Sequence, residues 1–99
     1  MVFDLSQIAD FGPYESKSEP SRQLFTKDGR VFLVVNKNTI EVRCDARLSE
    51  NLKEKYESVM ESRYFGRGGI EIVLSGQLSQ QELVDLVRLS YIISSSPSS

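Results

Sequence analysis

The chain of 99 residues contains no histidine and only one cysteine, Cys44. Without histidine it cannot form a Ser-His-Asp or Cys-His nucleophile pair within itself, nor a histidine-ligated metal site. One thiol can form neither an internal disulfide nor a zinc knuckle, and it fits a reducing compartment. No glycine-rich phosphate loop of the Walker or dinucleotide type occurs either. We therefore expect a protein that is not an enzyme and that uses no metal and no cofactor.

The sequence also lacks a strong charge bias and a long apolar run. Its net charge is −2, so no basic field covers the whole molecule, although a local basic patch is compatible with this balance. No stretch approaches the roughly 18 apolar residues of a membrane helix, and no basic leader with an apolar region opens the sequence. We expect one domain over residues 1–93, cytoplasmic, with no membrane partner and no small-molecule substrate.

A three-stranded antiparallel meander with two tight turns is predicted over Leu24–Cys44. Asp28-Gly29 is a pair typical of a type I′ hairpin, in which both central residues need a positive φ. The Asn36–Thr39 segment offers the second turn, because asparagine tolerates left-handed backbone. This meander is the part of the sequence around which the rest is expected to fold.

The two turns predict a register for the strands and therefore their two faces. Phe25 is expected opposite Phe32, and Leu24 opposite Leu33. In the second hairpin, the expected pairs are Val35 with Ile40 and Leu33 with Val42. The two-residue period of a strand then assigns six apolar residues to the core side: Leu24, Val31, Leu33, Val35, Ile40 and Val42.

The segments before and directly after the meander give weaker signals. Met1–Ala9 fits either a short helix or an extended arm, and Tyr14–Arg22 fits a loop or an edge strand, because Pro20 cannot lie in a central strand. Asp45 is a preferred N-cap, and apolar residues at helical spacing predict a helix from there to residues 60–63.

The C-terminal third predicts a strand, a helix and a tail. Gly69–Leu74 alternates in the manner of a strand, and Ser79 with Glu82 forms a capping box that opens a helix running to about Ile93. Residues 94–99 are rich in serine and are expected to be a disordered tail. These elements predict an α+β fold: a two-layer sandwich of an antiparallel sheet of about four to five strands, with two amphipathic helices on one face.

The predicted face opposite the core combines aromatic rings with positive charge. It holds Phe25, Lys27, Arg30, Phe32, Val34, Glu41 and Arg43, joined by Glu71 and Val73. The two phenylalanines and the three basic residues of this set could stack bases and hold phosphates, as in proteins that bind single strands. In the alternative interpretation, Phe25 and Phe32 pair with each other under the N-terminal segment, and the charges only keep the edge soluble.

The glycine-rich segment Tyr64–Gly69 is the second candidate site. Arg63 and Arg67 flank two aromatic residues there, and three glycines expose backbone amides that could cradle an anion. The alternative is a simple connection into a strand that needs a positive φ. Cys44 likewise has two interpretations, a thiol of lowered pKa near a helix N-terminus or a buried, unreactive small residue.

From Val31 onward, about two thirds of the chain resembles the MmcQ/YjbR family. The resemblance is carried by the VFLVV strand, Val42–Asp45, Glu54–Tyr56, Tyr64 and Arg67 before the IEIVLSG strand, Leu78–Glu82, and Ser90-Tyr91. The sequence departs from that family in its brief N-terminal segment. It also departs in Tyr64 and the Gly68-Gly69 pair, which stand where histidine and tryptophan often occur.

The resemblance implies a frataxin-like (CyaY-like) fold and a small DNA-binding module. The two candidate surfaces described above supply the candidate nucleic-acid contacts, which are Phe25, Lys27, Arg30, Phe32, Arg43, Arg63, Tyr64 and Arg67. A second function class stays open from the residues themselves. It is a protein-protein interaction domain that uses the open sheet face or an edge strand to bind another protein or a second copy.

Overall fold

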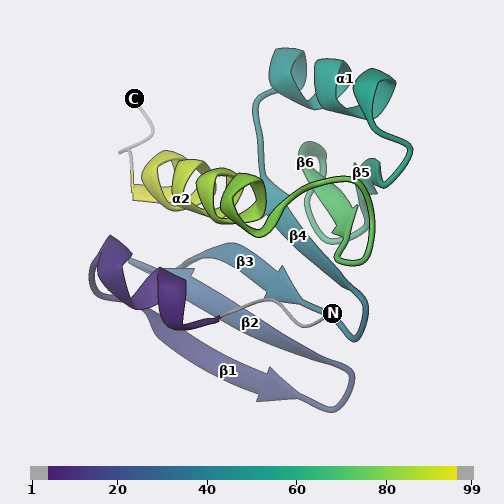
Figure 1. Cartoon of the computed structure of the whole chain (residues 1–99). Coiled ribbons are helices and arrows are strands. Elements are labelled where there is room, and N and C mark those ends of the chain that lie inside the picture. The colour runs from purple at the N-terminus through teal and green to yellow at the C-terminus, as the bar shows by residue number, and fades with distance from the viewer. Residues whose placement is uncertain (1–4, 96–99) are drawn as a thin grey trace.

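The computed structural model describes residues 5–95, in which a 3₁₀ helix, two α-helices and six strands follow one another (Figure 1). Their order is η1 (Leu5–Phe11), β1 (Glu15–Glu19), β2 (Arg22–Lys27), β3 (Arg30–Val35), β4 (Thr39–Arg43), α1 (Ala46–Lys55), β5 (Val59–Ser62), β6 (Gly66–Val73) and α2 (Gln80–Ser95). The strands form one antiparallel sheet in the order β1-β2-β3-β4-β6-β5. The α+β class is confirmed, and among the described residues the sheet has six strands where four or five were expected.

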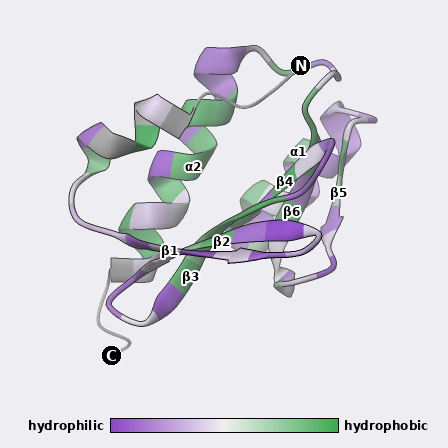
Figure 2. Ribbon diagram, turned by 90° about the horizontal axis from the view of Figure 1, so that it is seen from below, coloured by the Kyte–Doolittle hydropathy of each residue, from purple (hydrophilic) through white to green (hydrophobic). Residues whose placement is uncertain are grey.

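Both helices cover the same face of the sheet, as predicted. α2 packs across β3 and β4, whereas α1 packs against β5 and β6 (Figures 1 and 2). The core between the layers contains Leu33, Ile40 and Ile72, whose side chains are completely buried. Within the part of the chain that the structure describes, no helix has both the length and the apolar character needed to cross a membrane.

The turn between β2 and β3 has the predicted backbone. Asp28 has a φ of 53° and Gly29 a φ of 81°, so both central residues are left-handed, as a type I′ turn requires. Lys27 and Arg30 pair at the base of this turn. The second hairpin also has the predicted register, with Val35 paired to Ile40 and Leu33 to Val42.

The predicted register between β2 and β3 is wrong beyond the turn, because β3 contains a bulge. Thr26 pairs with Val31, but the next pair is Phe25 with Leu33, so Phe32 is an extra residue on β3. A bulge places two residues opposite one and changes which way the strand presents its side chains. A single extra residue therefore moves Phe25 to the core side.

The bulge exchanges the faces that the sequence predicted for three apolar residues. Phe25 and Phe32 belong to the core under the helices, with exposed fractions of 3% and 0%. Leu24, expected in that core, pairs with Val34 and lies on the face turned away from the helices. We call this second face, which also carries Glu41, the open face of the sheet.

Both helices begin at the residues that the capping pattern predicts. The Asp45 carboxylate accepts a hydrogen bond from the Leu48 amide at 3.0 Å. At the start of α2, the Ser79 hydroxyl accepts from the Glu82 amide at 3.2 Å, and the Glu82 carboxylate accepts from the Ser79 amide at 2.9 Å. Local sequence therefore decides where these helices start.

The ends of both helices differ from the prediction. α1 was expected to reach residues 60–63, but it ends at Lys55, and Val59–Ser62 instead form β5 along β6. The backbone pairing of Val59 with β6 therefore decides its conformation, although its spacing from the apolar residues of α1 is helical. α2 continues to Ser95, so Ser94, expected in a disordered tail, is helical and buried.

The N-terminal segment forms η1 and then β1, an edge strand that pairs with β2. The edge-strand interpretation of Tyr14–Arg22 is thus confirmed for Glu15–Glu19. The expectations for residues 1–4 and 96–99 lie outside the described residues.

A buried hydroxyl of α2 joins β3 to β4 beside the bulge. Ser90 Oγ donates to the carbonyl oxygen of Phe32 at 2.6 Å and accepts from the amide of Arg43 at 2.8 Å. The regular ladder between the two strands ends at the pair Leu33 and Val42, so the next two backbone groups meet this hydroxyl instead of each other. Ser90 therefore satisfies two backbone groups and fixes α2 on the sheet at once.

We expect Ser90→Ala to lower the free energy of unfolding by about 2–3 kcal/mol, because it leaves a buried carbonyl and a buried amide unpaired. Ser94→Ala is the matched control: it makes the same change on the same helix, at a buried hydroxyl without a hydrogen-bond partner. It should change stability by less than about 0.5 kcal/mol. Urea unfolding followed by circular dichroism measures both, and equal effects would contradict the bridging role of Ser90.

Candidate functional site

The structure does not expose the two phenylalanines that were expected to stack bases. Phe25 and Phe32 have ring centroids 6.5 Å apart, and the Tyr14 ring packs edge-on against both, at 5.7 and 6.2 Å. The Tyr91 ring of α2 packs edge-on against Phe32, with a distance of 5.0 Å between the ring centroids. The alternative interpretation, in which these rings pair and residues of the N-terminal segment cover them, agrees with this packing. Neither ring is available to a ligand.

Of the three basic residues predicted beside those rings, Lys27 and Arg30 are cross-strand neighbours, but Arg43 has different surroundings. The Lys27 ammonium rests 3.9 Å from the Tyr91 ring centroid, on the helix side, and Arg30 is exposed at the hairpin end. Arg43 Nε donates to the Val31 carbonyl at 2.7 Å, and its guanidinium lies 5.0 Å from the centroid of the Phe65 ring. The predicted basic-aromatic surface is therefore not assembled as expected.

The second candidate segment folds over the open face. The turn at residues 63–65 joins β5 to β6, and it is held down by Glu41 of β4. Glu41 Oε1 accepts from the Ser62 hydroxyl at 2.7 Å and from the Tyr64 amide at 2.8 Å. Gly66 follows with a φ of 62°, so the segment does contain a connection that needs left-handed backbone.

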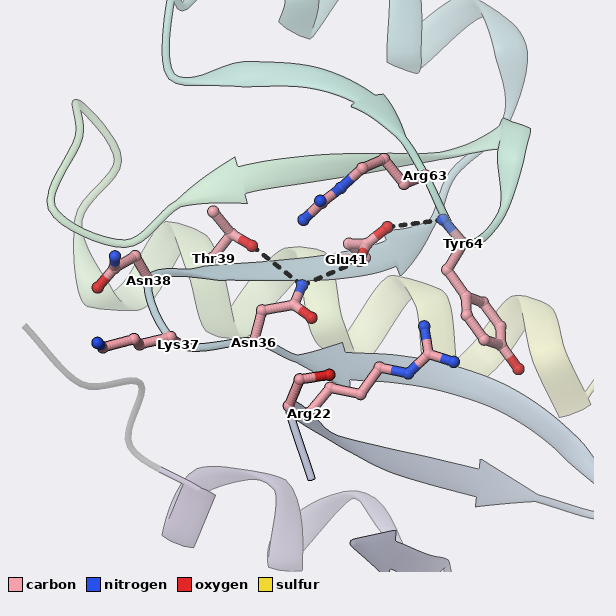
Figure 3. A pocket seen from close by; sticks show the side chains of 9 residues that line it. Arg22, Asn36, Lys37, Asn38, Thr39, Glu41, Arg63 and Tyr64 are labelled. Carbon is pink, nitrogen blue, oxygen red and sulfur yellow. Dashed lines mark hydrogen bonds between the residues drawn. The ribbon is translucent and has the colours of Figure 1, made fainter. Parts of the chain in front are cut away.

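Three of the predicted site residues lie in or near this turn, but the structure brings only two of them together. Arg63 and Tyr64 line one pocket, which has a volume of about 600 Å³ and is hereafter called the sheet pocket (Figure 3). Arg67 lies in a different groove, beside α1. The sheet pocket is lined by Ser21, Arg22, Asn36, Lys37, Asn38, Thr39, Glu41, Arg63 and Tyr64.

Most of the sheet pocket was missed because its parts are distant in sequence. Arg22 follows the β1–β2 turn and Lys37 lies in the β3–β4 turn, and the sheet order brings these two turns to the same end. The sequence pattern of the Asn36–Thr39 segment indicates only a turn. The one signal available was that Glu41 and Glu71 were both expected on the face opposite the core.

Two buried carboxylates form the centre of the open face. Glu41 and Glu71 are directly paired across β4 and β6, and their exposed fractions are 2% and 3%. Arg63 donates two hydrogen bonds to the Glu71 carboxylate, at 3.0 and 2.9 Å, and Thr39 Oγ1 donates a third at 2.7 Å. Like charges side by side are destabilising unless donors of this kind surround them.

Glu41 is ionised despite its burial. Burial by itself would raise the pKa of this carboxyl, but hydrogen bonds from Asn36, the Tyr64 amide and Ser62 outweigh it. The nearby Arg63 charge acts in the same direction, so the pKa of Glu41 lies below its usual value. The floor of the pocket therefore carries a negative charge at neutral pH.

The rim of the sheet pocket is aromatic and cationic. Tyr64 is exposed, and the Arg22 guanidinium lies 5.2 Å from its ring centroid while Arg22 Nε donates to Glu19 at 2.7 Å. Figure 3 shows this Arg22–Tyr64 pair at one end of the pocket and Lys37 at the other, with Asn36 and Glu41 between them. The site thus offers a planar surface, positive charge and hydrogen-bond acceptors.

The thiol of Cys44 is not a reactive group in this fold. Its side chain is buried, and that burial, together with the adjacent Asp45 carboxylate, raises its pKa to about 11. It is protonated at neutral pH, which agrees with the interpretation of a buried, unreactive residue.

Comparison of the chain with known proteins identifies no relative whose site could be compared with the sheet pocket. The chain matches no family model, no curated protein and no solved structure. The MmcQ/YjbR resemblance therefore stays a prediction.

The lowered pKa of Glu41 predicts an acid-dependent loss of stability. Because its pKa is lower when folded than when unfolded, its contribution is present above the usual glutamate value of about 4.3 and disappears as pH falls through the folded value. We expect Glu41→Gln to be less stable than the parent at pH 7, with the difference shrinking below about pH 4. Urea unfolding from pH 3 to pH 7 measures this. An unchanged difference across that range would contradict the ionised state of Glu41.

Proposed function

We propose that this protein is a small non-enzymatic module that binds single-stranded nucleic acid in the sheet pocket. The observation that carries the proposal is the placement of an exposed Tyr64 ring beside Arg22, with Lys37 and Arg63 on the same rim. Unstacked bases pack on aromatic rings and guanidinium planes, and each such contact contributes about 1–3 kcal/mol.

The charge around the pocket favours a single strand over a duplex. Arg22 pairs with Glu19 and Arg63 with Glu71, so exposed Lys37 is the cation best placed for a phosphate. Duplex binding depends mainly on neutralising many phosphates, which a pocket of nearly balanced charge cannot do. We therefore expect modest affinity that depends on base contacts and falls only slowly with added salt.

The predicted family relationship supports the same proposal. From Val31 onward the sequence resembles the MmcQ/YjbR family, whose members are commonly described as DNA-binding. We propose that the six-stranded sheet with two helices on one face is the CyaY-like sandwich that this resemblance implies. Of the eight candidate contacts first expected, the proposal retains Arg63 and Tyr64, and it adds Arg22 and Lys37.

A second candidate function, protein-protein interaction, is supported by one edge of the sheet. β5 pairs with β6 on one side, and within residues 5–95 no strand pairs with its other side. Met60 on this strand has an exposed fraction of 42%. An extended segment of a partner could add to this edge through backbone hydrogen bonds.

We expect Tyr64→Ala to weaken binding of a nine-nucleotide single strand about 5- to 150-fold, which corresponds to the loss of one stacked base. Tyr64→Phe is the matched control and should retain most of the affinity, because it keeps the ring. Fluorescence anisotropy at 20 and 150 mM salt measures the affinity, and a duplex of the same sequence should bind more weakly.

Amide NMR shifts during the same titration locate the contact. Shifts should appear at residues 21–22, 36–41 and 63–65. If no shifts appear even at low salt, the nucleic-acid proposal is wrong, and Met60→Ala in a partner pull-down becomes the next test of the β5 edge.

A further inference from the structure

We infer that the sheet pocket selects guanine over thymine and uracil, because Asn36 and Glu41, the two side chains at the centre of its floor, present hydrogen-bond acceptors and no free donor. This inference rests on the proposed function and concerns the same site. It follows from the hydrogen bonds of Asn36 with Thr39 and Glu41, which Figure 3 shows, and from the bond of Thr39 to Glu71.

The direction of each hydrogen bond in this network is fixed by chemistry. The Glu71 carboxylate can only accept, so Thr39 Oγ1 must donate its one hydrogen to it, at 2.7 Å. Thr39 Oγ1 therefore accepts from Asn36, which places the amide nitrogen of Asn36 on that side, at 3.0 Å. The second amide hydrogen of Asn36 goes to Glu41 Oε2 at 2.9 Å.

Both hydrogens of the Asn36 amide are thus used within the protein, and its carbonyl oxygen is left over. Among the described residues, no donor reaches Asn36 Oδ1. Glu41 Oε2 accepts only the bond from Asn36, whereas Oε1 accepts from Ser62 and Tyr64, so Oε2 keeps a lone pair. Two acceptors on neighbouring side chains therefore form the floor, and the hydroxyl of Thr39 adds no donor.

Among the bases, guanine matches this floor best. Its N1–H and N2 amino group are adjacent donors on one edge, so one can bind each acceptor. Thymine and uracil have a single N3–H between two carbonyl oxygens, and these oxygens would face the carboxylate of Glu41. Adenine and cytosine each offer one amino group, so their affinity should lie between that of guanine and that of thymine or uracil. A pair of matched hydrogen bonds discriminates between bases by about 1–3 kcal/mol.

Different parts of the pocket can bind the base and its phosphate. The Arg22–Tyr64 pair at one end supplies a planar surface, and Lys37 at the other end supplies a positive charge. The acceptors of Asn36 and Glu41 lie between these ends (Figure 3). A nucleotide is the ligand class that combines a planar ring, a donor edge and an anionic group in this way.

The test compares three nine-nucleotide strands that differ at one base: oligo(dT), and the same strand with a central guanine or a central hypoxanthine. Hypoxanthine lacks the N2 amino group and keeps N1–H, so it removes one of the two donors without any change in the protein. Fluorescence anisotropy should show the guanine strand binding about 5- to 150-fold more tightly than oligo(dT), with the hypoxanthine strand between them.

A protein variant tests the same point from the other side. In Glu41→Gln, Oε1 can still accept from Ser62 and Tyr64, so the new NH2 group faces Asn36. The side-chain amide of Asn36 then rotates, so that its carbonyl oxygen accepts from this group and its own NH2 faces the pocket. The floor then offers donors, and the preference for guanine should disappear. Glu61→Gln, at an exposed carboxylate of β5 outside the sheet pocket, changes the net charge equally and should retain the preference.

The outcomes separate this inference from the proposed function. Equal affinity for the three strands, with Tyr64→Ala still weakening binding, overturns the guanine selectivity and leaves single-strand binding intact. Retention of the full guanine preference by folded Glu41→Gln also overturns it. If none of the strands binds, both the inference and the proposed function are wrong.

Discussion

The hydrogen bonds around two neighbouring buried carboxylates organise the open side of this protein. Glu41 and Glu71 lie opposite each other on adjacent strands, where their charges repel unless donors surround them. The donors come from the Asn36–Thr39 turn and from the Ser62–Tyr64 segment, which are distant in sequence. Satisfying these charges therefore fixes two loops on the sheet and shapes the pocket between them.

The same requirement gives the pocket its chemical character. Because the hydrogens of Asn36 and Thr39 are committed to carboxylates, the floor is left with acceptors, while cations and an exposed ring stand at the rim. The stability of the buried pair and the proposed preference for one base have a common origin. A change that alters the network to adjust binding will also alter the attachment of the β5–β6 turn.

The opposite side of the sheet is stabilised by the burial of apolar side chains against the helices. The bulge at Phe32 turns two phenylalanines into the core, and Ser90 of α2 meets the backbone groups that the ladder leaves unpaired beside it. Aromatic rings that a regular ladder would present to solvent therefore stabilise the packing of α2 and η1. The sheet pocket correspondingly lies on the open face and not over the two phenylalanines.

The sequence by itself determined the features that depend on neighbouring residues: the Asp28-Gly29 turn, the Asp45 and Ser79 helix starts, and the α+β class. Periodicity carries no information about one extra residue in a strand, so only the tertiary structure decided that Phe32 forms a bulge. Pairing with β6 likewise decided that Val59–Ser62 is a strand. The sheet pocket was beyond sequence reasoning for the same reason, because its residues converge only through the order of strands.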